Sequence, residues 1–172
     1  MSRLVPLKRT EPLVAWRITR AEFAASALFG QGALPAEGRW HRVGQPVVYL
    51  AKTWSLAALA VFVHLGRRDF AIPLIYLGIT ILPEVSALAL DIEALPPDWI
   101  SEPPSPDTQT IGSDWLHSNA SALLGVPSML SPAESEYNWV VNPVHPDAAR
   151  LTVSEPKSFQ FDRRMWTADG RT

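Results

Sequence analysis

The sequence contains no cysteine. That absence excludes disulfide bonds, thiolate zinc sites and cysteine nucleophiles from the chemistry of this chain. Long apolar runs are missing as well: no stretch approaches the roughly 18 residues of a membrane helix, and the N-terminal residues have no apolar segment typical of a secretory signal. We therefore expect a cytoplasmic protein with no membrane partner.

A strong charge of either sign is also missing, since 15 Lys and Arg residues face 17 Asp and Glu residues for a formal net charge of −2. Without a basic field, phosphate neutralisation gives little affinity for nucleic acid, so we expect DNA contact only through a partner protein. The four histidines show no metal-ligand spacing, and we predict no metal site.

Apolar side chains are abundant: 47% of the 172 residues are hydrophobic, 19% are charged, and seven are Trp. A chain of this length buries enough surface for a self-sufficient core, which suits one domain over residues 1–172. The apolar excess and the tryptophans, which are favoured at binding hot spots, indicate that part of the surface is reserved for another chain.

Short strand and helix signals follow one another along the chain. We predict strands in the apolar runs bounded by turn residues, at 12–18, 46–50, 72–81, 139–142, 150–153 and 158–161. Helices or helical turns are expected at 21–28, 56–65 and 113–124, with a Gly-rich loop over 29–44 and a long Pro-rich loop over 95–112. Because strands and helices do not alternate as βαβ units, the pattern predicts an α+β fold.

The predicted helix at 56–65 has clear end signals. Thr53 or Ser55 is a plausible N-cap, and Gly66 stands where a helix C′ glycine belongs. The helix is apolar almost all round, so we expect it to be buried, with His64 as a core or interface histidine.

Two arginines have positions that suit an anion. Arg17 lies in the apolar run 12–18, where a buried charge requires a carboxylate or a phosphate ligand; an internal salt bridge or exposure at a sheet edge is the alternative. Arg39 follows the Gly-rich loop, where a guanidinium can approach a pyrophosphate bidentately, although an isolated Gly-Arg pair is more often a solvated turn.

Three uncharged polar residues are further candidates, each with two interpretations. Tyr49, amid Val and Leu, is either a core aromatic with a satisfied hydroxyl or a ligand-binding residue. Ser128 either caps a loop or contacts a ligand, and it is no triad nucleophile because no Gly-x-Ser-x-Gly surrounds it. Asn142 either closes a strand in a turn or holds a ribose or nicotinamide group.

Taken in order, these motifs resemble the RES-domain toxins of bacterial toxin–antitoxin systems. The resemblance covers residues 13–164 approximately and rests on Trp16-Arg17-Ile18, Gly30-x-Gly32-Ala33, Gly38-Arg39-Trp40, Val48-Tyr49-Leu50-Ala51, Ser55-Leu56-Ala57 with His64-Leu65, Thr108-Gln109 with Gly112-x-Asp114-Trp115-Leu116, Val126-Pro127-Ser128, Asn142-Pro143-x-His145-Pro146 and Phe161-Asp162-Arg163-Arg164. An ordered set of this kind is far more specific than any single motif.

The resemblance implies an ADP-ribosyltransferase-like core of small mixed sheets flanked by short helices. It implies an enzyme that takes NAD as its substrate, needs no prosthetic group, and depletes cellular NAD by hydrolysis, phosphorolysis or ADP-ribosyl transfer. The implied partners are an Xre-family antitoxin, which would bind DNA in place of the toxin, and a second toxin copy within a larger toxin–antitoxin complex.

Site roles also follow from the resemblance, residue by residue. Arg17 and Arg39 would grip the phosphates or the nicotinamide-side ribose, and Tyr49 would border the nicotinamide pocket. Ser128 matches the family's serine and would hydrogen-bond near the scissile ribose, while Asn142 is a weaker candidate. Together with Arg39 and Ser128, the family's catalytic set includes a glutamate.

The family's glutamate is absent, because its position after Ser-Leu-Ala-x-Leu is Ala60 here. A carboxylate there would stabilise the positive charge that develops when the nicotinamide–ribose bond breaks. We therefore expect an attenuated or inactive chain. Ala60 is either an introduced replacement, which the toxicity of an active form favours, or a natural divergence.

Two other classes of function remain open on the sequence. The chain could be a divergent RES domain that binds an antitoxin without enzymatic activity, or a small α+β ligand-binding domain with no link to NAD. Arg17 and Arg39 separate the last alternative from the others, since an NAD site should bring them together.

Overall fold

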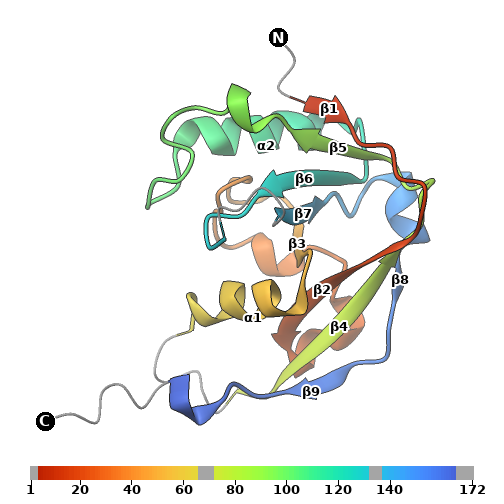
Figure 1. The fold of residues 1–172 in the computed structure, drawn as a ribbon, viewed down its shortest axis with the longest axis vertical. Coiled ribbons are helices and arrows are strands. Elements are labelled where there is room, and N and C mark those ends of the chain that lie inside the picture. Colours follow the sequence, from red (N-terminus) through yellow and green to blue (C-terminus); the bar gives the residue numbers. More distant parts are fainter. Residues whose placement is uncertain (1–3, 66–71, 132–136, 166–172) are drawn as a thin grey trace, which may run out of the picture.

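The computed structural model describes residues 4–65, 72–131 and 137–165, and its strands form one mixed sheet (Figure 1). The strands are β1 (Leu4–Pro6), β2 (Leu13–Arg20), β3 (Val48–Ala51), β4 (Leu74–Ile81), β5 (Ala87–Leu90), β6 (Leu123–Pro127), β7 (Tyr137–Val141), β8 (Thr152–Val153) and β9 (Lys157–Phe159). Their order is β1-β5-β6-β7-β3-β2-β4-β8, with β9 also paired to β4. Among the described pairs only β5 and β6 run parallel.

Helices are few and short within the described ranges. Two are α-helices, α1 (Trp54–Phe62) and α2 (Pro106–Ser118), and the rest are 3₁₀ turns: η1 (Ala21–Ser26), η2 (Gln31–Ala33), η4 (Ile92–Ala94), η5 (Pro146–Arg150) and η6 (Arg163–Met165). None of the helices in the described ranges has the length and apolar character that crossing a membrane would require.

The sheet consists of two parts that join at one position. β2 and β4 pair over eight successive residues, whereas β2 and β3 pair only between Trp16 and Ala51. The part with β5, β6 and β7 carries α2, and the part with β2 and β4 carries α1 (Figure 1). Both helices lie on the same face, because the residues packed against them share one side of the strands.

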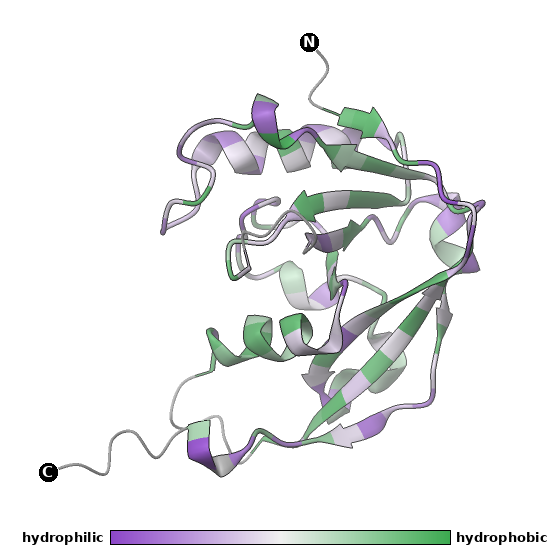
Figure 2. Cartoon of the chain, viewed as in Figure 1, coloured by the Kyte–Doolittle hydropathy of each residue, from purple (hydrophilic) through white to green (hydrophobic). Residues whose placement is uncertain are grey.

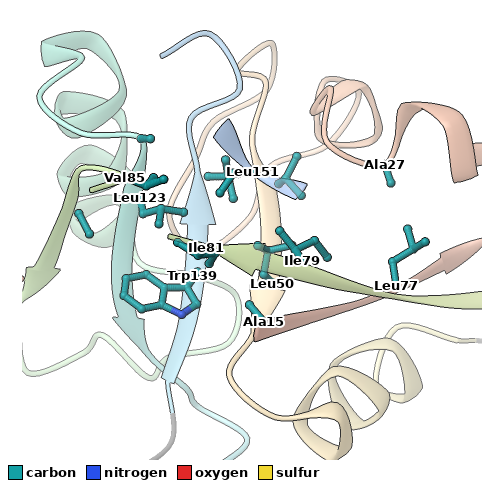
Figure 3. Packing of buried hydrophobic residues seen from close by; sticks show 14 of the residues in the cluster. Ala15, Ala27, Leu50, Leu77, Ile79, Ile81, Val85, Leu123, Trp139 and Leu151 are labelled. Atoms are coloured by element: carbon teal, nitrogen blue, oxygen red, sulfur yellow. The ribbon is translucent and has the colours of Figure 1, made fainter. Parts of the chain in front are cut away.

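Strand register explains which residues reach each face. Leu50 is opposite Trp139, and both pack with Ile79 in the main apolar cluster on one face (Figure 3). Tyr49 is opposite Val140 on the other face, in the cluster that packs against α2. Figure 2 shows mostly hydrophobic residues along β5 and β6, as burial on both faces requires.

Helix α1 corrects the expectation of a buried helix. Its N-cap is Thr53, whose hydroxyl accepts a hydrogen bond from the Leu56 amide at 3.2 Å, as predicted. Only Leu56 and Ala57 are buried within the helix, while Leu59 is 42% exposed. His64 is exposed as well, and Gly66 lies outside the described residues. One side of α1 packs on the sheet, and no described element covers the other.

The second α-helix begins earlier than predicted. Ser105 caps α2 and Pro106 occupies its first turn, so residues expected in a Pro-rich loop are helical. Asn119 ends the helix in a left-handed conformation, and residues 123–127 form β6 instead of continuing it. The fixed φ of proline suits the first helical turn, so prolines that mark a loop can also start a helix.

All six predicted strands are confirmed, with small shifts at their ends, as β2, β3, β4, β7, β8 and β9. The strands β1, β5 and β6 were not predicted. They complete the half of the sheet on which α2 packs.

Candidate functional site

A line of polar side chains crosses the face of the sheet that carries both α-helices. Tyr49 of β3 is opposite Val140 of β7, and Asn138, two residues earlier, is opposite Val126 of β6. Ser128 follows directly after β6, two residues beyond Val126. Diagonal neighbours on adjacent strands lie about 7–8 Å apart. Tyr49, Asn138 and Ser128, called the polar diagonal below, therefore form one group across three strands.

Asn138 occupies the middle of the polar diagonal. It is half-buried and has Ala51 and Val126 as its cross-strand neighbours. Its side-chain amide makes no hydrogen bond to another described residue. Asn138 is not among the candidates from the sequence, where the predicted strand begins one residue later. The sequence does carry a signal for it, because Asn138 is a polar residue between two aromatic ones, Tyr137 and Trp139.

Ser128 brings a buried hydroxyl to one end of the polar diagonal. The residue is 1% exposed, and its Oγ has no hydrogen-bond partner among the described residues. Leaving a buried hydroxyl unpaired costs about 1–3 kcal/mol. Such a group is available to a ligand that supplies the missing partner.

Arg39, on the loop between η2 and β3, contacts the residue that follows Ser128. Its Nη1 donates hydrogen bonds to the carbonyl oxygens of Trp99 and Ser101, the latter at 2.9 Å. Its Nη2 lies 3.0 Å from the sulfur of Met129, the residue after Ser128, and 3.5 Å from a Glu102 carboxylate oxygen. The Arg39 side chain is only 12% exposed whereas that of Glu102 is 71% exposed, so this ion pair neutralises the guanidinium weakly.

The Tyr49 hydroxyl, at the other end of the polar diagonal, is occupied by the same loop. It lies 2.9 Å from Nδ1 of His41 and accepts a hydrogen bond from the Trp40 amide at 3.3 Å. Burial raises the pKa of the Tyr49 phenol well above its ordinary value. The hydroxyl is therefore neutral, buried and already paired, which matches the interpretation of Tyr49 as a satisfied core aromatic.

Arg17 makes no hydrogen bond to Arg39, although both lie near Tyr49: Arg17 binds its main-chain carbonyl, and the charge of Arg39 acts on its phenol. Nη1 of Arg17 donates to the carbonyl oxygen of Tyr49 at 3.1 Å, and its Nε is buried without a partner among the described residues. Burial lowers the pKa of Arg17 to about 10. Its strand partner is Leu77 of the main apolar cluster, so Arg17 starts from the face opposite the Tyr49 ring. The hydrogen-bond partner of Arg17 among the described residues is therefore a main-chain carbonyl and not a carboxylate, and phosphate binding by Arg17 stays a prediction.

Asn142 lies outside the polar diagonal, at the opposite end of β7 from Tyr137. Its side-chain Nδ2 donates to Asn119 Oδ1 at 3.0 Å, and its Oδ1 accepts from the main-chain amide of Val144 at 3.2 Å. Four residues of strand separate Asn138 from Asn142, which is about 13 Å. These contacts are those of a residue that closes a strand in a turn, and the ligand role of Asn142 stays a prediction.

Ala60 lies on the side of α1 that packs on the sheet. At about 100° per residue it is within about 40° of Leu56 and about 60° of Ala57, the two buried residues of the helix. Ala60 itself is only half-buried. The sheet-facing side of α1 is therefore only partly covered at Ala60. A longer polar side chain there would reach solvent-accessible space beside the sheet.

Within the described ranges, no three His, Asp or Glu side chains gather where they could hold a metal ion. The arrangement offers a guanidinium, a hydroxyl and an amide, which are groups that bind phosphate, ribose and carboxamide by hydrogen bonds.

Comparisons with known proteins identify the family of the chain. The family model for the RES domain matches residues 14–162. Toxin Res of Photorhabdus laumondii is 41% identical over 154 residues, 89% of this chain and 97% of that protein. The Prs ADP-ribosylating toxin of a Sphingobium species is 35% identical over 154 residues, covering 87% of this chain and 94% of that protein.

Among solved structures, the MbcT toxin in the M. tuberculosis MbcT–MbcA toxin–antitoxin complex superposes with a TM-score of 0.71. The match covers 90% of this chain and 87% of that chain at 17% sequence identity. It confirms the α+β, ADP-ribosyltransferase-like fold expected from the sequence.

Proposed function

This chain belongs to the RES domain family, and we propose that it is the toxin of a toxin–antitoxin pair and acts on NAD. The names of its relatives support the proposal, since one is an ADP-ribosylating toxin and others are Res toxins. Residues 1–172 would then act as one RES domain in the cytoplasm, with NAD as substrate and no prosthetic group.

The observation that carries the proposal is the contact of Arg39 with the sulfur of Met129, the residue that follows Ser128 and its unpaired hydroxyl at one end of the polar diagonal. Arg39 would hold the diphosphate of NAD, because its guanidinium is nearly buried and weakly neutralised. Ser128 and Asn138 would bind the nicotinamide-side ribose and the carboxamide, since both have unused hydrogen-bonding capacity.

The reaction breaks the bond between the ribose C1′ and the nicotinamide nitrogen. The electron pair of that bond leaves with nicotinamide, and C1′ becomes an oxocarbenium-like centre that water, phosphate or a protein side chain attacks. An acceptor that loses a proton in this attack passes it to solvent. Arg17, at the Tyr49 carbonyl where β2 and β3 separate, would contact the substrate only if that contact exchanged for a phosphate oxygen.

Ala60 removes the carboxylate that would face the oxocarbenium. Losing one such electrostatic contact costs about 3–4 kcal/mol, or roughly a hundred- to a thousand-fold in rate, while substrate binding can survive. We therefore expect this chain to bind NAD and to cleave it slowly or not at all. Ala60→Glu should restore cleavage, because the half-buried position has room for a longer side chain.

The test compares nicotinamide release by the chain, by Ala60→Glu and by Ala60→Gln, each with and without inorganic phosphate. Gln has the shape of Glu without its charge, so only Ala60→Glu should cleave NAD, and a phosphate requirement would identify the acceptor. If Ala60→Glu is folded, binds NAD and still leaves it intact, the enzymatic proposal is refuted.

The proposed partner is an antitoxin of the Xre family, in a complex that contains two toxin copies. Apolar side chains of α1 support a protein partner, because Trp54, Leu59 and Val63 are 38%, 42% and 53% exposed. DNA would be bound only through the antitoxin.

Ala60 also favours a second candidate function, a RES domain that binds its antitoxin without acting on NAD. This alternative predicts that neither the chain nor Ala60→Glu binds NAD, while both bind the antitoxin.

A further inference from the structure

We propose that His41 is a positioning residue: its neutral ring anchors the Tyr49 hydroxyl and thereby fixes the loop that presents Arg39. The anchor itself stands on the geometry of His41 and Tyr49. Its consequence for NAD rests on the proposed function of Arg39.

The hydrogen bonds around the Tyr49 hydroxyl determine the state of His41. A phenolic oxygen accepts hydrogen bonds and donates its single hydrogen. Tyr49 Oη accepts from the Trp40 amide at 3.3 Å, and the other polar atom in contact with it is Nδ1 of His41 at 2.9 Å. Nε2 of His41 is buried without a hydrogen-bond partner among the described residues, so either tautomer leaves a group unpaired. A proton on Nδ1 would leave both the phenolic hydrogen and Nε2 without a partner, whereas a proton on Nε2 leaves only that proton unpaired. We therefore infer a neutral ring with its proton on Nε2.

The surroundings of His41 keep the ring neutral. The residue is 4% exposed, and burial lowers the pKa of His41, against a smaller opposing effect of nearby carbonyls and Glu37. The other charged group near the pair is Arg39, on the same loop, and its positive charge opposes the rise in the pKa of Tyr49. Helix α2 contributes only the uncharged Gln109 here, which donates from Nε2 to the Gly38 carbonyl at 3.4 Å.

The His41–Tyr49 pair holds the main chain on both sides of Arg39. The Gly38 amide donates to the His41 carbonyl at 3.1 Å, and the Trp40 amide is bound to the Tyr49 hydroxyl. Gly38 leaves space for the ring, because a Cβ at that position would lie 2.5 Å from Cε1 of His41. A substitution that displaces the His41–Tyr49 pair should therefore displace Arg39.

Protonation of His41 would weaken the anchor. A second hydrogen on the ring turns Nδ1 into a donor, so the Tyr49 oxygen accepts from it as well as from the Trp40 amide, and the phenolic hydrogen loses its acceptor. Because the pKa of His41 is lowered, the neutral form persists below the ordinary histidine value of about 6.5. NAD affinity should fall as the pH drops through the lowered pKa of His41.

The first arm of the test is independent of NAD. Long-range ¹⁵N–¹H spectra of histidine-labelled protein report the tautomer and the titration of each ring. We expect His41 to be the Nε2-protonated tautomer with a midpoint below about 6.5, and Tyr49→Phe to change both its Nδ1 shift and its midpoint. A proton on Nδ1, or a Nδ1 signal that Tyr49→Phe leaves unchanged, would overturn the anchor.

The second arm measures NAD affinity against pH. His41→Asn keeps an acceptor near the place of Nδ1 but cannot titrate, so it should bind NAD well and lose the acid-side fall. His41→Leu has no acceptor and should bind NAD about tenfold more weakly at every pH. Affinity in His41→Leu that equals the unmodified chain would reject the positioning role. Absence of NAD binding in every form would instead reject the proposed function and leave the first arm to judge the anchor.

Discussion

Gly112→Ala should destabilise the protein although it places a better helix former in α2. A Cβ at Gly112 would overlap the carbonyl oxygen of Trp40 and lie 2.6 Å from its carbonyl carbon, so the helix and the loop that carries Arg39 must move apart. In an uncrowded helix the change from Gly to Ala would stabilise by about 1 kcal/mol. At this position the contact is with main chain, which cannot rotate away as a flexible side chain can.

The clash outweighs the gain in helix propensity. Overpacking in a well-packed core costs about 1–3 kcal/mol, and a contact this short belongs at or above the upper end of that range. We expect a net loss of about 2 kcal/mol, which lowers Tm by roughly 4–8 °C for a chain of this size. NAD affinity should fall as well, because Trp40 follows Arg39 directly.

Thermal denaturation followed by circular dichroism measures the effect, with Gly32→Ala as the matched control. No heavy atom lies within 4 Å of a Cβ placed at Gly32, so the control should stay within about 0.5 kcal/mol of the unmodified chain. If Gly112→Ala were as stable as the unmodified chain, the close packing of α2 on Trp40 would be refuted.

Two further substitutions test the polar diagonal. Asn138→Ala should weaken NAD binding about tenfold by calorimetry while leaving Tm within error, because the amide makes no hydrogen bond to another described residue; a large loss of Tm would show that Asn138 is structural. Ser128→Ala removes an unpaired buried hydroxyl, so it should leave unfolding unchanged or raise stability by up to about 1 kcal/mol, yet slow NAD cleavage in the Ala60→Glu background. A Ser128→Ala chain that cleaves NAD as fast as its parent would exclude the hydroxyl from the site.

Local sequence signals predicted most strands and misplaced the second helix. Apolar runs between turn residues located β2, β3, β4 and β7, because burial on both faces leaves an almost continuous apolar stretch. The same reasoning merged Leu123 and Leu124 with the preceding helix, since a short apolar run does not distinguish a buried strand from a buried helix. The left-handed Asn119 was the missed stop signal.

Which residues belong to the site depends on the strand register, which cannot be read from the sequence. Asn138 and Asn142 flank the same strand, and each could hold a ligand on chemical grounds. The antiparallel pairing of β7 with β6 places Asn138 at the end near Ser128 and Asn142 at the end where β6 begins. A shift of one residue would exchange the faces of the whole strand, so only the pairing decides between them.

The same limit applies to Tyr49, for which the structure adds a contact that the sequence does not indicate and leaves the role at the nicotinamide pocket a prediction. Tyr49 was singled out as a border of the nicotinamide pocket, but its hydroxyl is bound by the loop that follows Gly38. Eight residues separate His41 from Tyr49, and their contact requires the intervening chain to turn back on the strand. A tyrosine that anchors Arg39 and one that touches NAD look the same in the sequence. The tautomer of His41 tests the anchor directly, and the pH dependence of NAD affinity in His41→Asn tests whether that anchor acts on NAD binding.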